Sequence, residues 1–303
     1  MKILLTNINL DTPHGSEIWT WTIARELIRR EHKVSVYSRK YGYMARKIKE
    51  LGVTLLDPNP PTAKHYDIAI MNHSHVMRGE IEKLARPDKA VLMTHSIIQA
   101  VHGKLQPERP PLDWDCDKFK HVAISGEVAE YWSDRVAYPI ETIPNPVASE
   151  YFQIKQLNDR TPKRILWGNH RWKPPGVLFR AAKDQGYELI GGFNRKDPDD
   201  IKKIVVKSRI ICGTGRWIYE GMAAGRNCIV MNDKMILGHV TPNEYQAMQN
   251  YNMTLRNPTA KRAKQFRCEQ ALDNYEPKRG MDLRDVAENH LHVSKVVDRL
   301  LEV

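Results

Sequence analysis

The sequence predicts an α/β protein of two open domains, each with a parallel sheet covered by helices, facing each other across a cleft. Short apolar strands alternate with segments of helical periodicity along nearly the whole chain. A proline-containing stretch, Ile143–Val147 followed by Asp159–Lys163, separates an earlier series of these units from a later one. We therefore expect an N-terminal domain over residues 1–152 and a C-terminal domain over residues 153–303.

The first half opens with a strand at Lys2–Leu5, followed by a loop and by a helix over Glu17–Arg30 with apolar residues at helical spacing. Lys33–Tyr37 alternates as a second strand, and Tyr43–Leu51 has the composition of a basic helix. Further short strands are expected at Val53–Leu56, Ile68–Met71, Val91–Thr94 and His121–Ile124. In a sheet of this kind, ligands bind beyond the carboxyl ends of the strands.

The second half repeats the alternation. Strands are expected at Arg164–Trp167, Glu188–Ile190, Ile210–Cys212 and Asn227–Met231, with helices at Pro175–Gln185 and Pro198–Lys207. Thr241–Tyr251 carries a helix-start signature, with Thr241 as the cap and Pro242 at the first position. The amphipathic segment Leu283–Val303 is expected to form one final helix, which can pack back on the N-terminal domain.

Composition places the chain among globular proteins, because 41% of its 303 residues are hydrophobic and 27% are charged. No apolar run approaches the roughly 18 residues of a membrane span. The four cysteines, Cys116, Cys212, Cys228 and Cys268, lack the C-x-x-C spacing of a zinc site or redox motif. We therefore expect a reducing, cytoplasmic compartment, either peripheral to a membrane or in a host cell if the chain is phage-encoded.

The positive charge is concentrated in the second half. Residues 1–150 hold 20 basic and 19 acidic residues, whereas the remainder holds 27 and 17, which leaves +10 of the total of +11 there. This balance favours an anionic partner such as a nucleotide, nucleic acid, phosphoglycan or membrane surface, and does not choose among them.

The segment Gly213–Gly225 is the most informative part of the chain. Two glycines at Gly213 and Gly215 predict a tight turn, and a helix that carries Glu220 follows before the strand Asn227–Met231. Glycines let the backbone approach a phosphate, a helix N-terminus favours its charge, and an acidic side chain can bind a ribose. The alternative is an ordinary α/β turn with the same glycine pattern.

Several motifs occur in the order and spacing of a known family. They are Met1–Leu5 with Gly15-Ser16-Glu17, Tyr66–Ile70 with His73 and His75, Val91–His95, Val122–Ser125 with Glu127, Ile143–Asn145, and Tyr219–Gly225 with Val230. With these motifs the chain resembles the retaining, nucleotide-sugar-dependent glycosyltransferases of the GT-B fold, in particular the "glycosyl transferases group 1" family. The resemblance covers nearly the whole chain and implies two Rossmann-like domains.

The resemblance also implies a donor site in the C-terminal domain. It makes Glu220 the ribose ligand and adds the turn Gly213-Thr214-Gly215 and Arg216. Arg171 and Lys173 would neutralise the diphosphate, although their spacing is shorter than in the family. Cys212 stands eight positions before Glu220, where the family has a second Glu, so the contact to the donor sugar stays unassigned.

In the N-terminal domain the resemblance implies that His95 lies near the reacting sugar. The loop Gly15-Ser16-Glu17 would contribute Gly15 and Ser16 to the donor and Glu17 to the acceptor. Each has a structural alternative. His95 can be a core histidine, Gly15 can belong to a helix-entry turn, and Glu17 can be a first-turn carboxylate that interacts with the helix dipole.

A basic and aromatic segment in the same domain is a candidate acceptor or polyanion site. It contains Arg39, Lys40, Tyr41, Tyr43, Arg46 and Lys47. This mixture suits phosphate contacts with stacking on a base or sugar, or a membrane surface, while a solvated helix is the alternative. We expect no metal site, because neither His73-x-His75 nor the acidic Asp113–Asp117 has a complete ligand set.

Taken with this resemblance, the sequence predicts a hexosyl- or pentosyltransferase that uses a nucleotide-diphosphate sugar, and the resemblance implies that it is retaining and needs neither a metal nor another cofactor. Its acceptor would be anionic, either an envelope glycan or lipid or the hydroxymethylated DNA of phages, and no obligate protein partner is evident. The alternatives are a sugar-nucleotide epimerase on the same fold and a non-catalytic nucleotide-sugar-binding protein.

Overall fold

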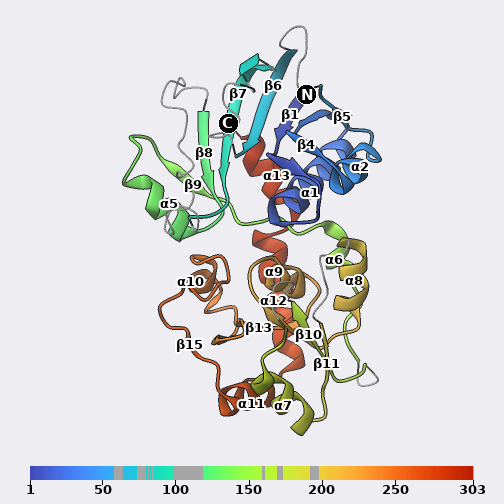
Figure 1. Cartoon of the computed structure of the whole chain (residues 1–303), viewed down its shortest axis with the longest axis vertical. Coiled ribbons are helices and arrows are strands. Elements are labelled where there is room, and N and C mark those ends of the chain that lie inside the picture. The colour runs from blue at the N-terminus through green and yellow to red at the C-terminus, as the bar shows by residue number, and fades with distance from the viewer. Residues whose placement is uncertain are drawn as a thin grey trace. The chain divides into compact units, whose positions relative to one another are not determined.

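The computed structural model describes residues 1–57, 64–73, 80, 82–83, 85–97, 119–158, 161–168, 173–191 and 198–302. The chain divides into two α/β units (Figure 1). Residues 1–146 and 293–303 form the first unit, and residues 147–292 form the second. The second unit therefore begins within the proline-containing stretch, and the last helix belongs to the first unit.

The first unit contains a seven-stranded sheet in which all neighbouring strands are parallel. Its order is β5-β3-β1-β6-β7-β8-β9. In chain order the strands are β1 (Lys2–Thr6), β3 (Lys33–Tyr37), β5 (Thr54–Leu55), β6 (Lys64–Asn72), β7 (Ala85–Thr94), β8 (Phe119–Ala123) and β9 (Ile140–Thr142). Two short strands, β2 (Asn9–Leu10) and β4 (Lys40–Tyr41), form a separate pair.

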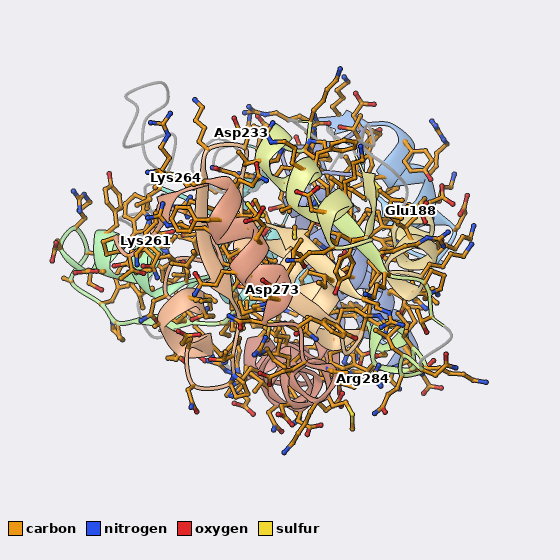
Figure 2. The ribbon with its side chains drawn as sticks, turned by 90° about the horizontal axis from the view of Figure 1, so that it is seen from below. Glu188, Asp233, Lys261, Lys264, Asp273 and Arg284 are labelled. Carbon is orange, nitrogen blue, oxygen red and sulfur yellow. The ribbon has the colours of Figure 1, made fainter. Side chains whose placement is uncertain are left out.

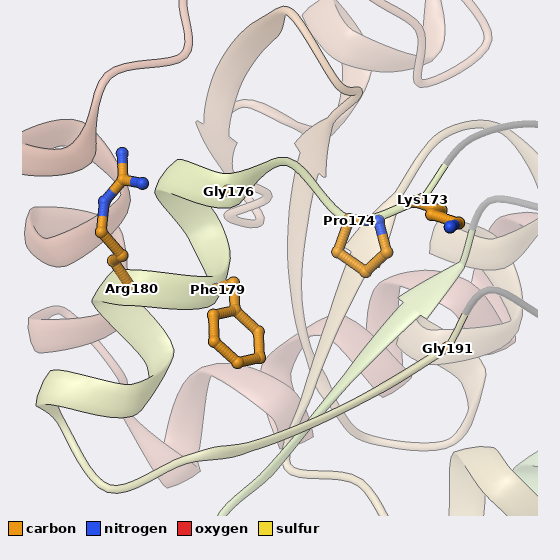
Figure 3. Close-up of a pocket in the computed structure, with 6 residues that line it drawn as sticks. All are labelled: Lys173, Pro174, Gly176, Phe179, Arg180 and Gly191. Carbon is orange, nitrogen blue, oxygen red and sulfur yellow. The ribbon is translucent and has the colours of Figure 1, made fainter.

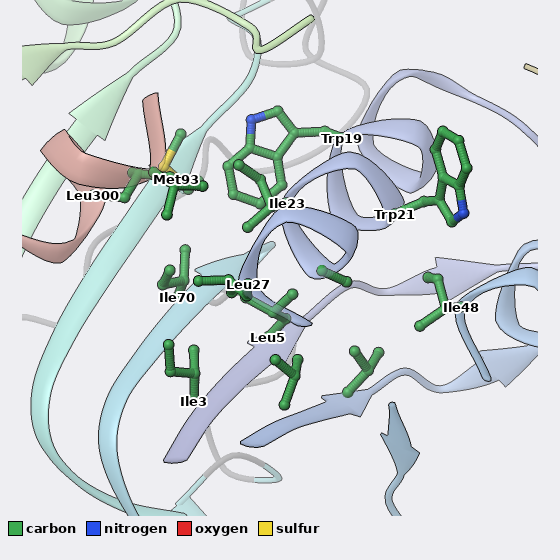
Figure 4. Close-up of a cluster of buried hydrophobic side chains, with 14 of the residues drawn as sticks. Ile3, Leu5, Trp19, Trp21, Ile23, Leu27, Ile48, Ile70, Met93 and Leu300 are labelled. Carbon is green, nitrogen blue, oxygen red and sulfur yellow. The ribbon is translucent and has the colours of Figure 1, made fainter. Parts of the chain in front are cut away.

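The central strands of this sheet carry buried apolar side chains on both faces, as expected for a parallel sheet. Ile3, Leu4 and Leu5 of β1 are fully buried. The helices α1 (Gly15–Arg29), α2 (Tyr43–Lys49) and α13 (Val293–Leu301) contribute to the core on the Ile3 and Leu5 face (Figure 4). The helix α5 (Gly126–Ser133) packs its Trp132 in a smaller cluster near β8.

The second unit contains a six-stranded sheet of order β11-β10-β12-β13-β14-β15. In chain order the strands are β10 (Arg164–Gly168), β11 (Glu188–Gly191), β12 (Ile210–Gly213), β13 (Asn227–Met231), β14 (Met235–His239) and β15 (Lys261–Arg262). The first four pair in parallel, and the last two add an antiparallel edge that the sequence analysis did not predict. The turn before β14 depends on Asn232, whose Oδ1 accepts the backbone N–H groups of Lys234 and Met235 at 2.9 and 2.7 Å.

Helices cover both faces of this second sheet. On one face lie α7 (Gly176–Asp184) and α11 (Gln265–Asp273), which pack against Trp167 and Cys212. The other face is covered by α6 (Ser149–Phe152), α8 (Pro198–Val206), α9 (Arg216–Ala223), α10 (Tyr245–Gln249) and α12 (Pro277–His290). The layers alternate as the sequence predicts for an α/β protein.

Two helix predictions are wrong in extent. The predicted helix Leu283–Val303 is broken between α12 and α13, where the Leu291 carbonyl accepts the Val147 N–H at 2.7 Å. The predicted helix Thr241–Tyr251 shortens to α10. Thr241 Oγ1 accepts the Glu244 N–H at 3.2 Å and donates to the Glu244 carboxylate at 2.9 Å, so the capping residues close a turn ahead of the helix.

Candidate donor and transfer sites

The turn between β12 and α9 requires glycine at two places. A Cβ added to Gly213 would lie 2.7 Å from the backbone oxygen of Gly168 on the neighbouring strand. Gly215 has a φ of 59° and precedes α9, and its N–H donates to the carbonyl of Met253 at 2.9 Å. Thr214 lies between the two glycines, so the predicted turn is present at the carboxyl edge of the second sheet.

Arg216 and Glu220 lie one turn apart at the start of α9. Arg216 Nε donates to Glu220 Oε1 at 2.6 Å, and the Glu220 residue is only 3% exposed. Burial raises the pKa of the Glu220 carboxyl, and the charge and hydrogen bond of Arg216 oppose that rise. Arg216 contacts Oε1, so a ligand hydroxyl that binds Glu220 either joins Arg216 at this oxygen or uses Oε2.

Tyr151 of α6 brings a phenol group to the same carboxylate. Burial raises the pKa of the Tyr151 hydroxyl well above its usual value, and the Glu220 carboxylate adds to that rise. Tyr151 is 3% exposed, so its hydroxyl stays protonated at neutral pH. Nothing in the sequence marks Tyr151 for this place, because it lies between the segments Ile143–Val147 and Asp159–Lys163, where no functional motif was recognised.

A cavity of about 500 Å³ lies beside the first turns of α7, near the ends of β10 and β11. It is lined by Lys173, Pro174, Gly176, Phe179, Arg180 and Gly191 (Figure 3). The Phe179 residue is 58% exposed, so its ring is accessible to a ligand. The cavity therefore combines an aromatic face with two cationic side chains. Of the two cations predicted to neutralise the diphosphate, Lys173 lines this cavity and Arg171 lies outside the described residues.

Cys212 is fully buried on β12, on the face covered by α7 and α11. Burial raises the pKa of its thiol well above the usual value, so the thiol is protonated. Cys212 therefore belongs to the core of the second unit.

In the first unit, the loop before α1 places Gly15, Ser16 and Glu17 at the N-terminus of that helix. Ser16 Oγ donates to Glu17 Oε2 at 2.9 Å, and Glu17 is 4% exposed. A Cβ added to Gly15 would meet no atom within 4 Å. Space therefore remains at Gly15 for a ligand to approach the backbone.

His95 follows the carboxyl end of β7 and remains partly exposed. Its Nε2 is 2.6 Å from Asn72 Oδ1, and its ring forms a T-shaped contact with Trp19, with centroids 5.5 Å apart. Burial lowers the pKa of His95, and His73 lowers it further, so the imidazole is neutral at pH 7.

Asn72 belongs to a buried polar cluster that the sequence analysis missed. The cluster also contains Thr6, Asn7 and Thr20, and all four residues are fully buried. The sequence gives only a weak signal for this cluster. Thr6 and Asn72 are the last residues of the apolar strands β1 and β6, and Asn7 directly follows β1. Buried polar groups are costly unless they are hydrogen-bonded.

The basic and aromatic segment of the first unit is partly engaged within the protein. Arg39 pairs with Glu80, Lys40 pairs with Asp11 at 2.5 Å, and the Tyr41 hydroxyl donates to the carbonyl of Leu56 at 2.8 Å.

Lys47 lies over the Trp21 ring at 5.6 Å, whereas Tyr43 and Arg46 are exposed on α2. Of the six predicted residues, Arg39, Lys40, Tyr43 and Arg46 are exposed.

A possible metal-ligand cluster lies elsewhere. The ligand atoms of His65, Asp67 and Asp88 are within 4.8 Å of one another. They lie toward the amino ends of β6 and β7, at the opposite sheet edge from His95. His75 and Asp113–Asp117 lie outside the described residues.

No protein-family model matches the chain, and no curated protein matches it. Solved structures do match. HepE of Anabaena in complex with UDP and glucose aligns with a TM-score of 0.62 and 13% identity, over 100% of this chain and 98% of that one. An alpha-glucosyltransferase in complex with UDP and a 13-mer DNA containing a HMU base aligns with a TM-score of 0.61 and 9% identity, over 100% and 98%.

The fold is the GT-B fold of glycosyltransferases. A Listeria monocytogenes protein described as a UDP-N-acetylglucosamine 2-epimerase also matches, with a TM-score of 0.53 and 13% identity over 99% of this chain and 94% of that one. These identities are low, so the likeness establishes the architecture. In the described part of the chain, no helix is long and apolar enough to cross a membrane.

Proposed function

We propose that this protein is a retaining glycosyltransferase that moves a sugar from a nucleotide-diphosphate sugar to a hydroxyl acceptor without a metal ion. The turn Gly213–Gly215 at the N-terminus of α9 carries the proposal. Its glycines let a phosphate approach the backbone, and the helix N-terminus favours negative charge. Two structural neighbours of the same fold hold UDP, one of them with glucose.

The donor would bind to the second unit. Its diphosphate would lie at the N-terminus of α9, with Arg171 and Lys173 as its cationic partners, and its ribose would bind Glu220. Negative charge builds on the leaving phosphate as the bond to the anomeric carbon breaks, so fixed cations and N–H groups lower the barrier. The leaving phosphate would help to deprotonate the acceptor hydroxyl on the same face of the sugar.

The first unit would supply the transfer site. Gly15 and Ser16 would contact the donor phosphates, His95 would bind a sugar hydroxyl, and Glu17 would orient the acceptor. Each of these residues lies at the carboxyl edge of the first sheet or at the helix that follows it, where α/β sheets bind ligands.

The acceptor we favour is anionic, either hydroxymethylated DNA or an envelope glycan. The charge of +10 on residues 151–303 supports this class. A neighbour of the same fold holds DNA with a modified base. Supplied with the nucleotide sugar that it binds, the purified protein should add mass to hydroxymethylated duplex DNA in the first case and to a lipid-linked glycan in the second. No product on either acceptor would reject this class.

The donor can be identified without knowing the acceptor. A panel of nucleotide sugars should contain one that raises the melting temperature, because a ligand of the native state stabilises it by mass action. If no member of the panel shifts the melting temperature, the proposed function is wrong.

A sugar-nucleotide epimerase is the second candidate, favoured by the structural match to a protein with that description. The two functions differ in what happens without an acceptor. An epimerase converts UDP-N-acetylglucosamine alone to its C2 epimer, whereas a transferase leaves that sugar's configuration unchanged.

A further inference from the structure

A chain of hydrogen bonds leads from α1 to His95 through buried side chains. Thr20 Oγ1 donates to the carbonyl of Ser16 at 2.9 Å, one turn earlier in the helix. A hydroxyl has one proton, so this oxygen can only accept from its other neighbours. Two amides reach it: Asn7 Nδ2 at 3.0 Å and Asn72 Nδ2 at 3.3 Å.

These contacts fix the orientation of the Asn72 amide. If the amide were reversed, Asn72 Oδ1 would face a Thr20 oxygen that has no proton left to share. Asn7 cannot supply a different arrangement, because its own Oδ1 accepts the backbone N–H of Asn9 at 3.4 Å. The backbone of Asn72 is also held, since its carbonyl accepts Thr6 Oγ1 at 3.1 Å.

The Asn72 orientation determines where His95 carries its proton. Asn72 Oδ1 has no proton, so His95 Nε2, 2.6 Å away, must donate. Burial keeps the ring neutral by lowering the pKa of His95, so the ring holds a single proton. Nδ1 then keeps its lone pair, and the T-shaped contact with Trp19 restrains rotation of the His95 ring.

We propose that Asn72 and Thr20 are positioning residues that hold His95 as the Nε2–H tautomer, so that Nδ1 accepts a hydrogen bond from a substrate hydroxyl. The choice of a hydroxyl ligand rests on the proposed function, whereas the tautomer does not. The arrangement predicts discrimination against a sugar that lacks this hydroxyl, because the Nδ1 lone pair would then lose its partner.

The tautomer can be read directly by ¹⁵N NMR of the histidine-labelled full chain, with His95→Gln to assign the signals. We expect a pyrrole-type Nε2 and a pyridine-type Nδ1 in the ligand-free protein. A pyrrole-type Nδ1 would overturn the proposal. This measurement requires no substrate, so it stands apart from any test of transferase activity.

Two threonines on α1 provide a matched pair of variants. Thr22 is also buried, and its hydroxyl donates to the carbonyl of Ile18 at 2.7 Å, in the same way as Thr20 donates to Ser16. Thr20→Val removes the hydroxyl from the relay, so Asn72 can turn and both His95 tautomers should appear. Thr22→Val should leave the Nε2–H tautomer unchanged. Equal spectra for the two variants would contradict the relay; Asn72→Ala repeats the test if Thr20→Val does not fold.

The proposed hydrogen bond between His95 Nδ1 and a substrate hydroxyl is tested by binding UDP-glucose. Saturation of the wild type should shift the His95 Nδ1 resonance, and Thr20→Val should weaken binding by about five- to tenfold, as for one lost hydrogen bond. Saturation without a shift at Nδ1 would reject the contact to the substrate. If UDP-glucose does not bind, the titration is repeated with the other nucleotide sugars of the panel; if none of them binds, that result counts against the proposed function and leaves the tautomer assignment standing.

Discussion

Arg216 precedes Glu220 by one turn of α9, and the Nε to Oε1 hydrogen bond between them is 2.6 Å long. This order is the less favourable one for a helix, because it places the cation nearest the positive N-terminus. The pair is therefore unlike an ion pair that stabilises a helix. The pair lies beside Gly215, where Arg216 can bind a ligand phosphate and Glu220 can bind a ligand hydroxyl.

We expect Glu220→Gln to weaken UDP binding by at least tenfold, because the charged acceptor for the ribose is lost while the shape of the side chain remains. Calorimetric titration with UDP measures this change. Glu188→Gln, on the exposed edge strand β11, is the control and should bind as the wild type does. Undiminished affinity in Glu220→Gln would remove Glu220 from the donor site.

The same variant should change how stability depends on pH. The pKa of Glu220 is raised in the folded state, so its contribution to stability is fully present below the unfolded pKa of about 4.5 and is lost as pH rises through the folded pKa. The melting temperature of the wild type minus that of Glu220→Gln should therefore increase as the pH falls from 7 toward 4.5. A flat difference would show that the folded and unfolded pKa values are equal.

Gly213 should not tolerate a side chain. In Gly213→Ala the new Cβ would meet the backbone oxygen of Gly168 at 2.7 Å, and a strand backbone cannot move aside cheaply. We expect a loss of about 1–3 kcal/mol in the free energy of unfolding, measured by urea denaturation. Gly15→Ala is the comparison, since its Cβ meets nothing within 4 Å, and it should cost no stability.

Lys173 should contribute to donor affinity through its charge. Lys173→Ala should weaken UDP binding, and the difference from the wild type should shrink as salt is added, because salt screens exposed charges. Lys183→Ala, in the last turn of α7 and away from the cavity lining, should have little effect. An equal loss of UDP affinity in the two variants would show that only the total charge of the protein matters and would remove Lys173 from the donor site.

Variants of Cys212 test whether this position can take the role of the second Glu that the family has there. Because Cys212 is fully buried against α7 and α11, Cys212→Glu should place an unpaired carboxylate in the core and prevent folding of the second unit. Cys212→Ala should fold, lose about 1–2 kcal/mol of stability and keep its UDP affinity. Circular dichroism and calorimetry separate these outcomes, and a folded Cys212→Glu with tighter donor binding would contradict this placement.

The sequence predicted most of the parallel framework, because periodicity reports burial on strands and helices. Lys33–Tyr37 and Asn227–Met231 are observed with the predicted bounds. The antiparallel edge was not predicted, since β15 is a two-residue strand, too short for a periodic signal. The helix break at Leu291 was also missed, because no local breaker residue marks it and the hydrogen bond between the Leu291 carbonyl and the Val147 N–H is a tertiary contact.

Sequence reasoning reached the candidate donor site only in part. Gly213, Gly215 and Glu220 could be found, because the glycine spacing predicts a turn and the resemblance adds the carboxylate. Tyr151 could not, and neither could Asn72 beside His95 in the first unit, since each contacts a residue that lies far away in the sequence. The burial of Cys212 depends on which face of β12 it occupies, and a short apolar strand does not reveal this.

The division of the chain has a consequence for synthesis on the ribosome. The helix α13 supplies Val296, Val297 and Leu300 to the same core as Ile3 and Leu5 of β1. Each such side chain contributes roughly 1.5–3 kcal/mol when it is buried. Residues 1–146 thus leave the ribosome before the helix that completes their core. The second unit is synthesised in the interval, so the unit that begins first is the last to be complete.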